Sequence, residues 1–264
     1  MMNEKVIFFD IDGTLLDHDK KIPASTRQTI DDLRRAGHHV AIATGRAPFM
    51  FKDLREELGI DSFVSFNGQF VVFEGEVIYK NPLKTETLEK VLAYSSQTKH
   101  PLVFMNHETM MASEGDHPFI RESMGSLKFD HPEVNPDFFT ESEIYQTLLF
   151  CKAGEEEAYK QYKDLHFIRW HDLATDILPM GGSKAEGIKK LVERLKFERE
   201  DIYAFGDELN DLEMIKYVGT GVAMGNANPK LKEIADFITK PVDEDGIQYA
   251  VHELGLLSSA PEKN

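Results

Sequence analysis

Two carboxylates near the start of the chain, Asp10 and Asp12, have the types and spacing to do chemistry. They follow a run of β-branched and aromatic residues at 5–9, which is typical of a strand buried on both faces of a parallel sheet. Because they are two positions apart, an extended chain directs both side chains to the same side. Neighbouring carboxylates repel each other unless a cation or a shared proton lies between them. This pattern predicts a catalytic strand end rather than an ordinary polar turn.

A second group of polar residues, Asp207, Asn210 and Asp211, follows another apolar run. Their i+3 and i+4 spacings place them on one face of an opening helical turn. Thr44 also follows an apolar run, and Lys184 opens a predicted helix. In open α/β sheets the active site lies outside the carboxyl ends of the strands, so we expect these groups to converge with the first pair. Carboxylates without cysteines or clustered histidines suit a hard cation, and Mg²⁺ fits best.

The elements that must hold these residues alternate between strand and helix. The predicted order is strand 5–9, helix 23–36, strand 39–43, helix 48–58 and strand 63–66. This order predicts an α/β fold with a Rossmann-like, doubly wound parallel sheet. The alternation resumes after Gly182, where Ser183 and Glu186 have the spacing of a capping box, and a strand at 201–205 precedes Asp207.

The alternation is lost between these two parts of the chain. A predicted hairpin at 70–79 is followed by mixed helices and strands, a loop-rich stretch with three prolines at 117–136, and a helix at 155–165. We therefore expect an α+β domain at 82–180, inserted into a core domain formed by residues 1–81 and 181–264. The inserted domain is expected to act as a cap that selects the substrate.

Composition excludes several classes of protein. The chain has 264 residues and a net charge of −16, which disfavours nucleic acid and anionic membranes as partners. Cys151 is the only cysteine, which argues against a disulfide framework or a thiolate zinc site and indicates a core residue. No apolar run is long enough for a membrane span, and the first residues lack the pattern of a signal peptide. We expect a cytoplasmic monomer or homodimer.

Four motifs, in this order, resemble those of the haloacid dehalogenase-like phosphatases, and of their Cof-type subgroup with its class IIB cap. The motifs are Asp10-Ile11-Asp12-Gly13-Thr14, Thr44-Gly45-Arg46, Ser183-Lys184 and Gly206-Asp207-x-x-Asn210-Asp211. Any one of them alone would be weak, but their order and spacing are specific, and the resemblance covers essentially the whole chain. It implies a Mg²⁺-dependent phosphatase for small phosphorylated metabolites.

The resemblance also implies a role for each matching residue. Asp10 would be the nucleophile and Asp12 the general acid and base. Mg²⁺ would be held by Asp10, the main-chain carbonyl of Asp12, and Asp207. Asp211 would orient Lys184 or a metal-bound water. The residues that would hold phosphoryl oxygens are Ile11, Thr44, Gly45, Lys184 and Asn210.

Some alternatives stay open. Arg46 is either a solvated charge or a substrate contact, and Thr14 either stabilises its turn or acts directly. In the inserted domain, surface placement is favoured for His107, Arg169, His171 and Asp176. The substrate class is sugar phosphates or nucleotide and cofactor phosphates. A phosphotransferase or mutase with the same nucleophile is the alternative, followed by a non-catalytic sensor of a phosphorylated metabolite.

Overall fold

The structure is a computed structural model that describes residues 4–257. The chain divides into two compact units, which we call the core unit and the inserted unit. The core unit comprises the described residues of Met1–Gly45, Lys52–Tyr79 and Ser183–Asn264, and the inserted unit comprises Arg46–Phe51 and Lys80–Gly182.

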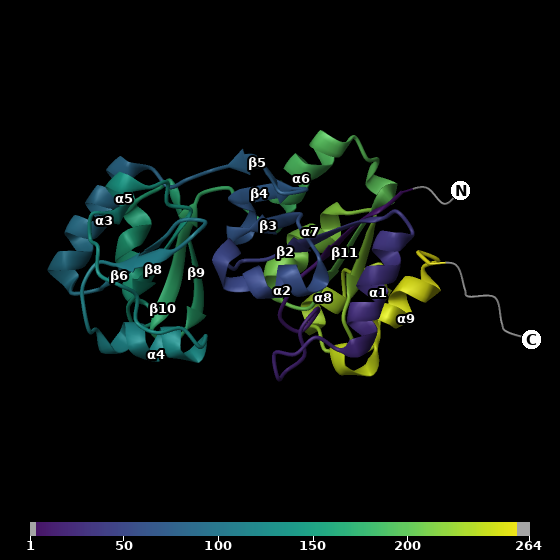
Figure 1. The fold of residues 1–264 in the computed structure, drawn as a ribbon. Coiled ribbons are helices and arrows are strands. Elements are labelled where there is room, and N and C mark those ends of the chain that lie inside the picture. Colours follow the sequence, from purple (N-terminus) through teal and green to yellow (C-terminus); the bar gives the residue numbers. More distant parts are fainter. Residues whose placement is uncertain (1–3, 258–264) are drawn as a thin grey trace, which may run out of the picture. The chain divides into compact units, whose positions relative to one another are not determined.

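The core unit is built on an eight-stranded sheet with the order β13-β12-β11-β1-β2-β3-β4-β5 (Figure 1). The strands from β13 to β3 run parallel, and β4 is antiparallel to β3. The bounds are β1 Val6–Phe9, β2 His39–Ala43, β3 Phe63–Ser65, β4 Phe70–Phe73, β5 Glu76–Lys80, β11 Ile202–Gly206, β12 Thr220–Ala223 and β13 Phe237–Ile238.

Strand β1 lies near the middle of this sheet because it is apolar throughout. All four of its residues are fully buried, and it pairs with β2 on one side and β11 on the other. Phe9 is opposite Ile42 of β2 and Phe205 of β11. The residues after these three strands therefore emerge at the same edge of the sheet.

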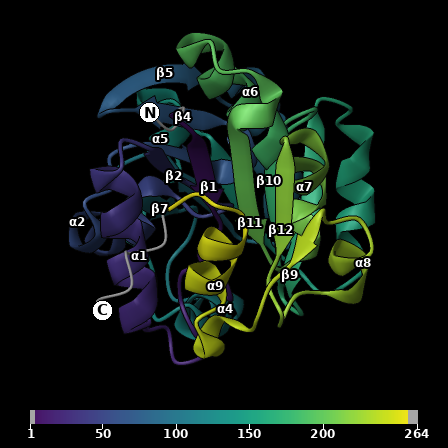
Figure 2. The ribbon, with the colours of Figure 1, turned by 90° about the vertical axis from the view of Figure 1, so that its right-hand side faces the viewer.

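The helices of the core unit are α1 Ala24–Arg35, α2 Lys52–Leu58, α6 Lys184–Leu195, α7 Leu212–Tyr217, α8 Pro229–Lys232 and α9 Gly246–Glu253. Helix α1 packs against α9 and against strand β2, whereas α6 packs against α7 and against β3 and β4 (Figure 2). The predicted α/β fold with a Rossmann-like core is confirmed. Among residues 4–257, no helix combines the length and apolar character needed to cross a membrane.

The inserted unit has its own five-stranded antiparallel sheet with the order β7-β6-β8-β10-β9. Its strands are β6 Leu102–Met105, β7 Met110–Ala112, β8 Gln146–Phe150, β9 Leu165–His171 and β10 Ala174–Pro179. Its α-helices are α3 Thr85–Thr98, α4 Pro118–Ser126 and α5 Phe138–Glu141. Leu88 and Val91 of α3 and Phe139 of α5 share a buried cluster with Leu149 of β8 and Ile177 of β10. Helices α3 and α5 thus cover one face of this sheet (Figure 1).

Two predictions for this unit hold only in part. The stretch at 117–136 is not simply a loop, because α4 begins at Pro118. Proline is favoured at the first helical position, where its missing N–H costs no hydrogen bond, and the His117 ring accepts the N–H of Phe119 as an N-cap. The helix predicted at 155–165 is shorter and is the 3₁₀ helix Glu155–Gln161.

Candidate active site

The centre of the candidate site is Lys184, the first residue of α6. Its ammonium donates to Asp10 Oδ1 at 2.6 Å and to Asp211 Oδ1 at 2.7 Å, although the lysine is only 1% exposed. Ser183 caps the helix by accepting the N–H of Glu186 at 3.3 Å, which is one of the two contacts of the predicted capping box. A Cβ on Gly68 would lie 2.0 Å from the Ser183 carbonyl oxygen, so only glycine allows the chain to pass this close to the start of α6.

Asp211 is held in place by three hydrogen bonds. One oxygen, Oδ1, accepts from Lys184, and the other, Oδ2, accepts the N–H groups of Asp207 at 2.9 Å and Glu208 at 3.0 Å. These contacts form because Asp211 ends the 3₁₀ turn Leu209–Asp211 that directly follows β11. Asp211 therefore has the contacts expected of a residue that orients Lys184.

The sheet brings three buried acidic residues of the core unit together. The N–H of Asp10 bonds to the Phe205 carbonyl at 3.0 Å, which fixes the end of β1 beside the end of β11. Asp10, Asp207 and Asp211 each have a carboxylate oxygen within 4.8 Å of the others, and all three are buried. Of the groups expected to converge, Asp10, Asp207, Asp211 and Lys184 do so in the structure.

This cluster holds more negative than positive charge. Burial raises the pKa of Asp10 to about 7, although the Lys184 ammonium opposes the rise. Burial raises the pKa of Asp207 to about 8, and the charges of Asp10 and Asp211 add to it. Burial opposes the charge on Lys184, but its carboxylate partners outweigh that effect and raise its pKa. A divalent cation among these oxygens would relieve the repulsion, so the donor set fits Mg²⁺.

Asp12 has a different environment from Asp10. Its side chain is 39% exposed, and its Oδ1 accepts from Lys20 Nζ at 2.6 Å. Lys20 has a left-handed backbone with φ of 62° and lies in a turn that Asp17 closes by accepting the N–H groups of Asp19 and Lys21. The two acids of the first motif are thus asymmetric, one buried beside Lys184 and one reachable by solvent.

Gly13 and Thr14 of the first motif lie against Asp207, and Asn226, which had no predicted role, holds the motif in place. Gly13 has a φ of 78°, and a Cβ there would lie 2.1 Å from Asp207 Oδ2. Thr14 donates to Asp207 Oδ1 at 3.3 Å. Asn226 donates to the Gly13 carbonyl at 2.9 Å and accepts the N–H of Val242 at 2.9 Å. The signal for Asn226 was available, because it follows strand β12 at the edge where Asp207 follows β11.

The other predicted site residues of the core unit differ in how they are placed. Thr44 follows β2, is 2% exposed, and is held by its N–H to the Val64 carbonyl at 2.8 Å. Gly45 lies beside the Asn67 amide. Ile11 is fully buried. Asn210 lies in the turn before α7 but is exposed and makes no hydrogen bond to the cluster in the described chain.

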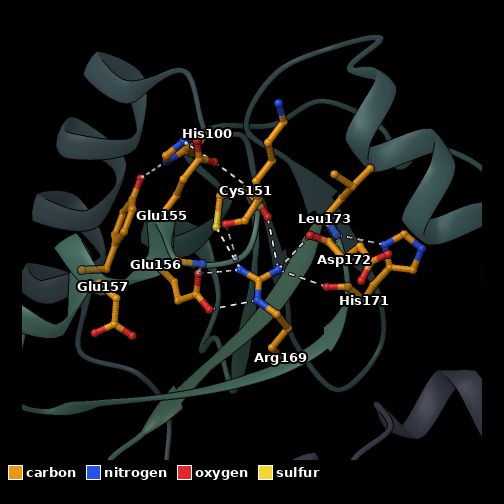
Figure 3. A network of polar contacts seen from close by, with 12 residues as sticks. His100, Cys151, Glu155, Glu156, Glu157, Arg169, His171, Asp172 and Leu173 are labelled. Carbon is orange, nitrogen blue, oxygen red and sulfur yellow. Dashed lines mark hydrogen bonds and ion pairs between the residues drawn. The ribbon is translucent and has the colours of Figure 1, made fainter.

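Two candidate residues group with the inserted unit, and one of them, Arg169, has a structural role there. Arg46 lies in Arg46–Phe51, the short segment that groups with this unit. Arg169 donates to both carboxylate oxygens of Glu156, at 2.9 and 2.7 Å, and to backbone carbonyls including that of Cys151 at 3.2 Å (Figure 3). Cys151 is buried as predicted.

Surface placement was also favoured for His107, His171 and Asp176, and it holds only in part for the two histidines. His107 and His171 are half-buried, and His171 contacts Ser123 Oγ at 3.1 Å. Asp176 is the correction, since only 9% of it is exposed. It was misjudged because a single acid within a strand of apolar residues carries no signal of which face is covered.

The chain matches the family model of the haloacid dehalogenase-like hydrolases over residues 7–251. It is 62% identical over 256 residues to the putative phosphatase YkrA of Bacillus subtilis (strain 168), which covers 97% of this chain and 100% of that protein. It is 30% identical over 249 residues to the 5-amino-6-(5-phospho-D-ribitylamino)uracil phosphatase YcsE of the same organism, with 94% of each chain covered. The solved structure of the HAD subclass IIB sugar phosphatase BT4131 has a TM-score of 0.80 at 28% identity, covering 96% of this chain and 100% of that one.

The chain therefore belongs to the haloacid dehalogenase-like hydrolase family. It is an enzyme, a phosphoric monoester hydrolase, and it is of the Cof type with subclass IIB structures among its neighbours. The family predicted from the four motifs is confirmed.

Proposed function

We propose that this enzyme is a Mg²⁺-dependent phosphatase that hydrolyses small phosphorylated metabolites through an aspartyl-phosphate on Asp10. The observation that carries the proposal is the buried Lys184, which bonds Asp10 and Asp211 at once. A lysine held in this way fixes a carboxylate in one orientation and places positive charge where a phosphoryl group would develop negative charge.

The reaction follows from the asymmetry of the two acids. An oxygen of Asp10 attacks phosphorus, and the bond from phosphorus to the ester oxygen breaks. Asp12 gives its proton to the departing alkoxide, then takes a proton from water as the water oxygen attacks phosphorus and releases phosphate from Asp10. Exposure of Asp12 lets it exchange protons with solvent, whereas burial of Asp10 keeps water from competing with the ester.

Mg²⁺ would be held by Asp10, Asp207 and the main-chain carbonyl of Asp12, and it would supply positive charge that keeps Asp10 ionised and offsets charge on the phosphoryl group. The fully engaged Asp211 keeps Lys184 in place rather than serving as a metal ligand. The residues that we assign to the phosphoryl oxygens are Ile11, Thr44, Gly45, Lys184 and Asn210, and Arg46 is assigned to the rest of the substrate.

The substrate class that we propose is sugar phosphates or nucleotide and cofactor phosphates. Two relatives named above support it, one a sugar phosphatase and the other a phosphatase of a ribitylamino-uracil phosphate. We assign the choice among these compounds to a cap domain at residues 82–180. The net charge of −16 means that an anionic substrate must be captured by local groups, not by the overall field.

The test is phosphate release by the purified protein from a panel of phosphorylated metabolites, with and without an added sugar acceptor. We expect multiple turnovers without an acceptor, and loss of turnover by more than about a thousandfold in Asp10→Asn. Asp19→Asn, in an exposed turn, is the matched control and should keep wild-type rates. Wild-type turnover in Asp10→Asn would refute the nucleophile, and a strict need for an acceptor would favour a phosphotransferase.

A further inference from the structure

The turn that follows strand β3 in the core unit, Phe66–Gly68, has an unusual backbone conformation. Phe66 and Asn67 both have a φ of 51°, in the left-handed region that L side chains rarely adopt. The other described non-glycine residues with a positive φ carry exposed side chains, whereas Phe66 and Asn67 are buried. A strained backbone at a buried position persists only where the surrounding structure requires it, and such positions cluster at functional sites.

This turn lies between two segments to which we assign phosphoryl oxygens. On one side, the N–H of Asn67 donates to the Thr44 carbonyl at 3.1 Å. The Thr44 carbonyl and the Gly45 N–H belong to one planar peptide and point in opposite directions, so this bond fixes the direction of the Gly45 N–H. On the other side, a Cβ on Gly68 would lie 2.0 Å from the Ser183 carbonyl oxygen, at the start of α6. The turn is therefore next to both groups of donors.

The side chain of Asn67 has no partner that would explain its burial. Asn67 is only 6% exposed, and its amide makes no hydrogen bond within residues 4–257. The amide lies against Gly45, because a Cβ built on Gly45 would be 3.0 Å from Asn67 Nδ2 and 3.1 Å from Oδ1. Neither amide atom is among the described side-chain atoms that are closed to solvent without a partner, so the amide keeps some contact with solvent.

The backbone conformation alone does not account for an asparagine here. Asparagine tolerates a left-handed backbone better than most residues, but glycine adopts it without strain and adds no polar group. An almost fully buried amide that makes no hydrogen bond destabilises the folded chain unless a bound molecule completes it.

The position of the amide indicates which molecule would complete it. Nδ2 carries two N–H donors, which suit the oxygens of an anion. The amide lies against Gly45, whose N–H we assign to a phosphoryl oxygen, so both groups can donate to one phosphoryl group. The net charge of −16 adds to the need for such local donors.

We propose that Asn67 is a further phosphate-binding residue of this enzyme. Its side-chain amide donates to a phosphoryl oxygen, and its backbone N–H holds the Thr44–Gly45 peptide in position for the same group. The inference rests on the proposed function and deepens it, because it adds to the phosphate site a donor that the four motifs do not contain.

The first test measures binding of orthovanadate, a phosphate analogue, by isothermal titration calorimetry in the presence of MgCl₂. Asn67→Gly keeps the backbone N–H and removes the amide, and we expect its dissociation constant for orthovanadate to rise about tenfold or more. Asn67→Asp keeps the shape of the side chain but turns acceptor oxygens toward the anion, so we expect a still larger rise.

Lys196→Gly is the matched control. Lys196 follows the last residue of α6, has a φ of 59°, and carries an exposed side chain. Both glycine variants relieve the same kind of backbone strain, so we expect similar melting temperatures for them. Lys196→Gly should bind orthovanadate like the wild type. The rise in melting temperature on addition of Mg²⁺ should persist in Asn67→Gly, because the amide has no contact with the carboxylate cluster among the described residues.

The second test compares two esters that share only the phosphoryl group. In Asn67→Gly, kcat/KM for phenyl phosphate and for glucose 6-phosphate should fall by the same factor. A contact between Asn67 and the organic part of the substrate would instead affect the two esters unequally.

The outcomes separate this inference from the proposed function. Unchanged orthovanadate affinity in Asn67→Gly, equal weakening in Lys196→Gly, loss of the Mg²⁺ effect, or unequal effects on the two esters would each overturn the inference. A wild-type protein that neither binds orthovanadate nor hydrolyses either ester would instead refute the proposed function.

Discussion

Lys184 and Asp211 form an ion pair with no solvent exposure on either side chain, and the nitrogen and oxygen are 2.7 Å apart. The same ammonium also forms an ion pair with Asp10. One lysine therefore compensates the carboxylates of two segments that are far apart in the sequence. A buried pair of this kind adds little net stability, but removal of one partner leaves a buried charge without compensation.

Lys184→Met tests this directly. We expect a loss of about 3–5 kcal/mol in the free energy of unfolding, since Asp10 and Asp211 would be left facing each other, together with loss of phosphatase activity. Lys189→Met is the control on the same helix, because the exposed contacts of Lys189 with Glu186 and the Tyr217 ring should change stability by less than about 0.5 kcal/mol. Urea unfolding measures both. Equal stability of the two variants would mean that the buried pair is not needed.

Metal binding should stabilise the folded protein. Burial and then the charge of Asp10 raise the pKa of Asp207, so a divalent cation between the two carboxylates removes repulsion. MgCl₂ at a hundredfold excess over its dissociation constant should add about 2.7 kcal/mol to the free energy of unfolding. Differential scanning calorimetry with EDTA and then Mg²⁺ measures this, alongside loss and recovery of activity. The shift should disappear in Asp207→Asn and persist in Asp32→Asn on α1. Activity indifferent to chelation would argue against the metal.

Gly13→Ala should abolish activity because of a collision and not only because of its backbone. A Cβ at Gly13 would lie 2.1 Å from Asp207 Oδ2, so Asp207 or the loop must move. Gly37→Ala is the matched control, with a φ of 89° and nothing within 4 Å of its Cβ. Both variants should lose about 1–2 kcal/mol from left-handed strain, but only Gly13→Ala should lose kcat. Similar activities would show that Asp207 tolerates displacement.

Glu156 should make the inserted unit sensitive to acid. Its hydrogen bonds with Arg169 lower its pKa from 4.5 to about 2, so its contribution is complete above about pH 4.5 and is lost as the pH falls toward 2. Glu156→Gln should cost about 2 kcal/mol at pH 7, and the difference from wild type should shrink between pH 4.5 and pH 3. Glu157→Gln, whose side chain is 64% exposed, is the control. A difference that does not depend on pH would exclude the ion pair as its cause.

Much of the core unit follows from local patterns. Apolar runs that end in polar residues predicted strands β1, β2 and β11, and the parallel arrangement placed their ends together. The error at α4 arose because three prolines suggested a loop, whereas Pro118 in fact begins a helix. Helix starts with proline and loops with proline look alike in sequence, and only packing of Ile120 and Met124 into a buried environment distinguishes them.

The sequence by itself determined the family and selected Asp10, Asp12, Lys184 and Asp207 as members of the candidate site, because motif order and strand-end position are local properties. The tertiary structure alone decided their partners. Lys184 reaches Asp10 across 174 positions, and Asn226 reaches Gly13 across 213. It also showed that Asp176 is buried with an unsatisfied oxygen. Burial and hydrogen-bond partners depend on which distant segments pack together, and that information is absent from residue spacing.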